Sequence, residues 1–311
     1  MNFSLEKVVG GTIEQKNAAK EILKNAFEMQ DFEGLSEVEV QKTPEIFECI
    51  DLANKVTSEV LERYGINKEH IGADKIHIIK KDAWPDDSSD SGAFFRLSHQ
   101  CICVEEGQEK IKTAKYIIHE IFHFTSHLVA QILPDNQITD YRTGLTVNTR
   151  DGQQLQFNHL NEAVAEELTC EAMRTQLFKE TFAEEIKEIE NIMTQHSGAE
   201  DFEGNPLFTE HTYYAEVGDE RQDGTFPIFT SEISYQKERQ GLEILIDKLY
   251  EVNKDMFENQ KEIYEVFVKS SYSGDLFKIG RLIEKTFGKG TFRKLASSKT
   301  SEEFLATIEN L

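Results

Sequence analysis

Residues 116–127 read YIIHEIFHFTSH, which places three histidines and one glutamate in an otherwise largely apolar stretch near the middle of the chain. Apolar residues occupy almost every side of the helix that this stretch would form, which is typical of a buried helix. Imidazole and carboxylate groups in such a place need partners, and a metal ion can supply them. The stretch is therefore a candidate metal-binding helix in the core of the fold.

The spacing of these polar residues favours one particular metal chemistry. His119 and His123 are four residues apart, so on a helix they project only about 40° from each other and can meet one ion. Glu120 is turned by about 100° from His119 and can approach a metal-bound water from the side. Two histidines and a glutamate in this order are typical of zinc hydrolases, in which the glutamate is the general base. We predict one Zn²⁺, with His119 and His123 as ligands and Glu120 as the catalytic base.

A catalytic zinc site needs a third protein ligand. The segment LNEAVAEEL (160–168) offers Glu162 and Glu166, which share one face of a second predicted helix. Glu162 can ligate the ion, and Glu166 can accept a hydrogen bond from the far nitrogen of a ligating histidine. Asp135, Asp140 and His127 are alternative ligands. We expect His127 to pack or hydrogen-bond nearby instead, because a third ligand from the same helix would drift off the metal.

HEIFH followed by NEAVAE resembles the thermolysin-like metallopeptidases, the gluzincins, and most of all the small bacterial and archaeal members with LNEA at the second helix. The resemblance implies that His119, His123 and Glu162 bind zinc and that Glu120 is the base. Glu166 stands where the group often has an aspartate that orients the first histidine. The group stabilises the oxyanion with a tyrosine or histidine from beyond the second helix. The candidates for that role here are Tyr213, Tyr214, Tyr235 and His211, while Tyr141 and Arg142 follow the first helix closely enough to reach the cleft.

The order of the predicted elements indicates an α+β fold, because strands and helices do not alternate regularly. We expect a small mixed or antiparallel sheet, with an edge strand over the buried active-site helix and a mainly helical C-terminal region. Three units are predicted: an N-terminal helical region (1–70), a zincin-like catalytic core (71–196) and a C-terminal subdomain that completes the cleft (197–311). The predicted elements are helices at 13–30, 45–64, 110–133 and 161–180, strands at 74–80, 92–97, 100–106, 211–217 and 225–229, and a hairpin at 143–158.

Composition narrows the possible partners. The net charge of −23 argues against binding to nucleic acid or anionic membranes and could favour cationic peptides. Without a long apolar run or a recognisable signal peptide, we expect a cytoplasmic protein. The four cysteines form no CxxC pair, so a cysteine-based zinc site is not expected. A zinc-dependent peptidase is the leading hypothesis. The alternatives are a zinc hydrolase acting on a non-peptide amide or ester, and a non-catalytic zinc-stabilised regulatory or binding protein.

Overall fold

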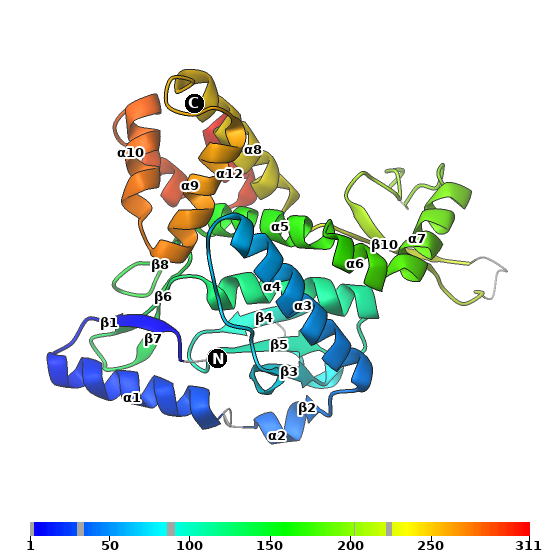
Figure 1. The fold of residues 1–311 in the computed structure, drawn as a ribbon, viewed down its shortest axis with the longest axis horizontal. Helices are drawn as coiled ribbons and strands as arrows, with labels where there is room; N and C mark the ends of the chain where they lie inside the picture. The colour runs from blue at the N-terminus through cyan, green and yellow to red at the C-terminus, as the bar shows by residue number, and fades with distance from the viewer. Residues whose placement is uncertain (1–2, 30–33, 86–90, 202, 222–225) are drawn as a thin grey trace.

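A computed structural model describes residues 3–29, 34–85, 91–201, 203–221 and 226–311 (Figure 1). Its helices are α1 (Ile13–Met29), α2 (Leu35–Val38), α3 (Pro44–Arg63), α4 (Lys110–Thr125), α5 (Asn158–Met173), α6 (Gln176–Thr181), α7 (Ala183–Gln195), α8 (Gln236–Val252), α9 (Gln260–Ser273), α10 (Leu276–Phe287), α11 (Thr291–Ala296) and α12 (Ser301–Glu309). Its strands are β1 (Leu5–Val9), β2 (Glu39–Val40), β3 (Ile76–Ile79), β4 (Ala93–Arg96), β5 (Cys101–Glu105), β6 (Leu128–Ile132), β7 (Ile138–Thr143), β8 (Thr146–Asn148), β9 (Leu155–Gln156), β10 (Thr212–Val217) and β11 (Ile228–Glu232).

Two mixed sheets and a separate hairpin account for these strands. One sheet has the order β2-β3-β5-β4, with β3 and β5 parallel and β4 antiparallel at its edge. The second has the order β1-β6-β7-β8-β9, in which β1 and β6 are parallel. Strands β10 and β11 form the antiparallel hairpin. The fold is therefore mixed α+β, as predicted, and both larger sheets are mixed rather than purely antiparallel.

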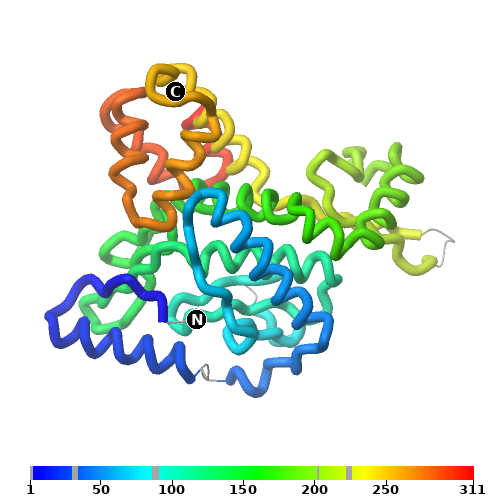
Figure 2. Tube along the Cα trace, in the orientation of Figure 1, coloured from blue at the N-terminus to red at the C-terminus, as the bar shows by residue number. Residues whose placement is uncertain are grey.

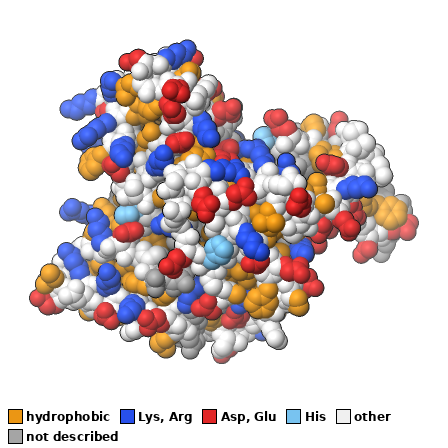
Figure 3. Space-filling view, in the orientation of Figure 1, with side chains coloured by type: hydrophobic (Ala, Val, Ile, Leu, Met, Phe, Trp, Pro, Cys, Tyr) orange, Lys and Arg blue, Asp and Glu red, His pale blue; other side chains and the backbone are white. Residues whose placement is uncertain are grey.

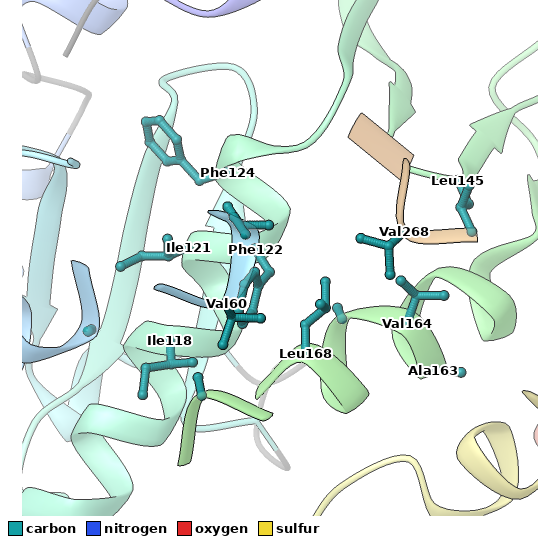
Figure 4. Packing of buried hydrophobic residues seen from close by; sticks show 14 of the residues in the cluster. Val60, Ile118, Ile121, Phe122, Phe124, Leu145, Ala163, Val164, Leu168 and Val268 are labelled. Atoms are coloured by element: carbon teal, nitrogen blue, oxygen red, sulfur yellow. The ribbon is translucent and has the colours of Figure 1, made fainter. Parts of the chain in front are cut away.

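Helix α4 lies in the middle of the core, between the sheet that ends in β4 and the helices α3 and α5. Ile118, Ile121 and Phe122 project from α4 into the apolar cluster that Val60 of α3 and Leu168 of α5 also enter (Figure 4). The polar residues of this helix therefore sit in a largely apolar environment. Their positions are fixed by packing on several sides.

Helix α3 begins at Pro44, one residue before the predicted start. Pro44 occupies the first turn, and the side chain of Thr43 accepts a hydrogen bond from the backbone N–H of Ile46.

The predicted division of the chain at residues 70 and 196 stays a prediction.

The predicted helix from Lys110 to Leu133 is wrong beyond Thr125. Ser126 adopts an extended backbone conformation, and the chain continues as strand β6 between β1 and β7. Composition alone cannot distinguish a short apolar strand from the end of a buried helix. Here, pairing with β1, more than a hundred residues earlier in the chain, selects the strand. The predicted hairpin around Asp151 and Gly152 is present as the β8–β9 pair.

The rest of the chain divides between an arm and a helical group. Helices α6 and α7 and the β10–β11 hairpin extend away from the end of α5 as the arm (Figures 1 and 2). Helices α8 to α12 pack together above the other end of α5, which confirms a mainly helical C-terminal region. Acidic side chains are scattered over the face shown in Figure 3. No helix within the described ranges has both the length and the apolar character needed to cross a membrane.

Candidate metal centre

Two helices bring three ligand-type side chains to one point. Helix α4 supplies His119 and His123, and α5 supplies Glu162. The Nε2 atoms of the two histidines are 3.1 Å apart, and Glu162 Oε2 lies 3.2 Å from His123 Nε2 and 3.4 Å from His119 Nε2. Tetrahedral coordination with bonds of 2.0–2.1 Å requires ligand atoms about 3.3–3.4 Å apart. The three atoms therefore lie close to the spacing that three ligands of one zinc ion would need.

A second set of contacts holds His119 in place. Its Nδ1 lies 2.8 Å from Glu166 Oε2, one turn beyond Glu162 on α5. Glu166 is fully buried, and its other oxygen contacts Lys115 Nζ at 2.8 Å and accepts a hydrogen bond of 3.0 Å from the backbone N–H of Ser234. Lys115 is itself 2% exposed and lies one turn before His119 on α4. Glu166 therefore contacts both His119 and the buried ammonium group of Lys115, and these contacts fix the orientation of the imidazole.

The electrostatics of this cluster favour a bound cation. Burial opposes protonation of His119, but hydrogen bonds to Glu162 and Glu166 outweigh it and raise the pKa of the imidazole to about 10. Burial also opposes ionisation of Glu162, yet the adjacent histidines hold the pKa of its carboxyl well below the usual range. For Glu166, the charge of Lys115 outweighs burial and lowers the pKa to about 2. Two ionised carboxylates thus flank the histidines, and a divalent cation can replace the proton on His119.

Glu120 lies beside the three ligand-type residues and lines the same cavity, which has a volume of about 290 Å³. The side chain is 7% exposed. Burial raises the pKa of this carboxyl above its ordinary value, and the nearby His119 and His123 oppose the rise. A raised carboxyl pKa brings a general base closer to the pH at which it works.

Strand β4 forms one wall of the cavity through Ala93, Phe94 and Phe95. It pairs with β5 on one side, and among the described strands no other pairs with it. Its outer edge is therefore not paired with any described strand, although Ser91 donates a hydrogen bond to the carbonyl of Ala93.

Of the four residues predicted as oxyanion stabilisers, the structure brings Tyr235 to the cavity. Its ring stacks on His119 with centroids 5.7 Å apart and planes inclined by 14°. The charge of Glu162 and burial both raise the pKa of the Tyr235 hydroxyl far above its ordinary value, so it stays protonated. It is therefore a hydrogen-bond donor, and in the structure its partner is Glu162, the candidate third ligand.

The other three candidates lie outside the set of described residues that line this cavity. The ring of Tyr213 contacts the ammonium of Lys115, with 5.7 Å from Nζ to the centroid. Tyr214 donates its hydroxyl hydrogen to Glu216 on the same strand. His211 lies 3.8 Å from the carboxylate of its neighbour Glu210.

The alternative ligands are separated from the three-residue cluster. His127 packs its ring against Gly274, and its backbone N–H donates to the carbonyl of Ser271. Asp135 accepts a hydrogen bond in the β6–β7 turn. Asp140 lines the cavity, as do Tyr141 and Arg142, but only His119, His123 and Glu162 group as possible metal ligands within the described residues.

Sequence reasoning missed several contributors to this site, among them Ser234, Lys115 and Asn161, whose Nδ2 lies 3.3 Å from His123 Nδ1. Ser234 follows strand β11 and has no local pattern that signals a contact with Glu166. Lys115 did carry a signal, since it is a charged residue four positions before His119 on a largely apolar helix. A buried lysine needs a carboxylate partner, and the second helix offers one.

Comparison of the chain with known protein families, with curated proteins and with solved structures found no match. Inference about function therefore depends on the chemistry of the site.

Proposed function

We propose that this protein is a zinc-dependent metallopeptidase of the gluzincin type. The observation that carries the proposal is the set of distances between His119, His123 and Glu162, together with a further carboxylate, Glu120, that lines the same cavity. A purely structural zinc site usually closes all four positions with protein ligands and needs no adjacent base. Here three candidate ligands and Glu120 line one cavity, so a bound ion would be accessible to a substrate.

The roles of the residues follow from their positions. Zinc would supply Lewis acidity, which activates water and polarises a carbonyl group. Glu120 would accept the proton of the attacking water and deliver it to the leaving amine. Tyr235 would donate a hydrogen bond to the carbonyl oxygen as negative charge develops on it. The edge of β4 would hold an extended peptide across the cavity.

Metal analysis is the first test. We expect about one zinc per wild-type chain by mass spectrometry after dialysis, and much less in Glu162→Gln. The matched control is Glu167→Gln, which changes the same kind of residue on α5 outside the cluster and should keep its zinc. A wild-type chain that holds no zinc would remove the proposal.

Activity is the second test. Wild-type protein should cleave members of a mixed peptide library, and Glu120→Gln should lose about 10²–10⁴-fold in rate while keeping its zinc. Cleavage of esters or non-peptide amides alone would favour the alternative hydrolase. Zinc binding without any hydrolysis would favour a regulatory or binding protein.

A further inference from the structure

The metal centre occupies only one part of its cavity. The second sheet contributes another wall, formed by Asp140 and Thr143 of β7 and by Thr146 and Asn148 of β8. The register of β7 against β6 shifts between its pairs at Arg142 and Asp140. Such a bulge bends the strand locally, and all four residues from Asp140 to Thr143 line the cavity there.

Asp140 is the acidic residue of this wall. Its side chain is exposed to the cavity, yet protein surrounds it closely enough that burial raises the pKa of the carboxyl to about 6. At neutral pH the carboxylate is therefore mostly ionised. Within the described parts of the chain, no lysine, arginine or histidine forms an ion pair with it.

The nearest cation in sequence, Arg142, is engaged elsewhere. Its Nε donates to the carbonyl of Gly144 at 2.7 Å, and its Nη1 donates to the carbonyl of Gly274 at 2.5 Å. Burial lowers the pKa of this guanidinium, and the carboxylate that favours its charge is Asp275 rather than Asp140. The cavity therefore presents an ionised carboxylate whose counter-charge must come from solvent or from a ligand.

We propose that Asp140 is a specificity residue that binds a cationic group of the peptide substrate, so that the enzyme selects substrates carrying a positive charge near the scissile bond. This inference rests on the proposed function. A lysine or arginine side chain and a free N-terminal ammonium share the required chemistry. Asp140 is exposed on the cavity wall without a cationic partner among the described residues, so its carboxylate is free to pair with a positive group that enters the cavity. The net charge of −23 would also draw cationic peptides towards the protein.

Peptide binding without turnover tests this inference. Zinc-loaded Glu120→Gln would be titrated with alanine hexapeptides, N-acetylated and amidated, in which each position in turn is lysine or norleucine. At one position we expect lysine to bind at least about 10-fold more tightly than norleucine, and adding Asp140→Asn should reduce that ratio to about 2-fold or less. The control substitution is Asp135→Asn, an acidic residue of the same hairpin outside the cavity, and it should leave the ratio unchanged.

A matching set of peptides with a free amino terminus identifies the source of the charge. A preference for lysine in acetylated peptides assigns a side chain, whereas a preference only for peptides with a free amino terminus assigns the α-ammonium. Equal binding of charged and neutral peptides would overturn the inference, and so would a preference that survives Asp140→Asn. Asp140→Ser serves as a second variant should the asparagine protein not fold.

The outcomes separate this inference from the proposed function. A lysine preference that depends on Asp140, in a protein that hydrolyses no peptide, would refute the peptidase and leave the cation site standing. Hydrolysis of charged and neutral peptides at equal rates would refute the cation site and leave the peptidase standing.

Discussion

The buried pair of Lys115 and Glu166 makes the most exacting prediction. Nζ and Oε1 are 2.8 Å apart, and the two side chains are 2% and 0% exposed. Lys115→Met would leave the Glu166 carboxylate buried without its main counter-charge. Removing one partner of a buried ion pair costs about 3–5 kcal/mol. Because Glu166 keeps its contacts with Ser234 and His119, we expect the lower end, about 3 kcal/mol.

A double-mutant cycle measures this effect. Urea unfolding at pH 7, on protein freed of metal, would give the free energies of unfolding of wild type, Lys115→Met, Glu166→Gln and the double variant. The double variant should recover stability relative to Lys115→Met, with a coupling energy of at least about 1.5 kcal/mol. If the stability losses of the two single variants sum to that of the double variant within about 0.5 kcal/mol, the two residues are not coupled and the reasoning is refuted. The exposed pair of Lys55 and Asp51 on α3 is the control, and Lys55→Met should cost about 0.5 kcal/mol or less.

Three further predictions follow from the site. Tyr235→Phe should lower kcat about 10²–10³-fold in peptide hydrolysis and leave KM nearly unchanged, because the lost hydroxyl would donate a hydrogen bond to the developing oxyanion. An unaltered kcat would mean that another group stabilises the oxyanion. Zinc binding at pH 7.5 should release about one proton, because His119, with its pKa raised to about 10, must become neutral to ligate. The affinity for zinc should therefore fall as the pH falls. Calorimetry in buffers of different ionisation enthalpy would measure the number of protons released, and a value of zero would contradict the prediction. Asp140→Asn should raise the melting temperature relative to wild type, and the gain should be larger at pH 8 than at pH 5. The raised pKa of Asp140 means that its ionisation costs stability as the pH rises from the unfolded value through about 6, and an equal gain at both pH values would contradict it.

Local patterns were enough to locate the helices that carry the proposed metal ligands. The spacing of His119 and His123 and that of Glu162 and Glu166 each define one helical face, and the apolar surroundings of the first pair indicate burial. These signals lie within one or two turns of a single helix. Sequence therefore predicted which residues could meet, although the distances among them depend on how α4 and α5 pack.

Long-range pairing explains what the sequence did not reveal. Strand β6 continues an apolar run that fits a helix equally well, and only β1 and β7 make it a strand. That strand in turn fixes β7, which places Asp140 on the cavity wall. From the sequence, Asp140 was only an alternative metal ligand, because no local pattern shows that its strand will line the cavity.

The junction between β11 and α8 shows that the site is assembled from three separate parts of the chain. Ser234 donates its backbone hydrogen to Glu166, and the next residue, Tyr235, stacks on His119. Tyr235 adopts a left-handed backbone conformation with φ of 56°, which costs a non-glycine residue about 1–2 kcal/mol. In that conformation the consecutive residues Ser234 and Tyr235 contact Glu166 and His119, respectively. The strained residue therefore lies where the chain meets the candidate site, which is where strained backbone is most often retained.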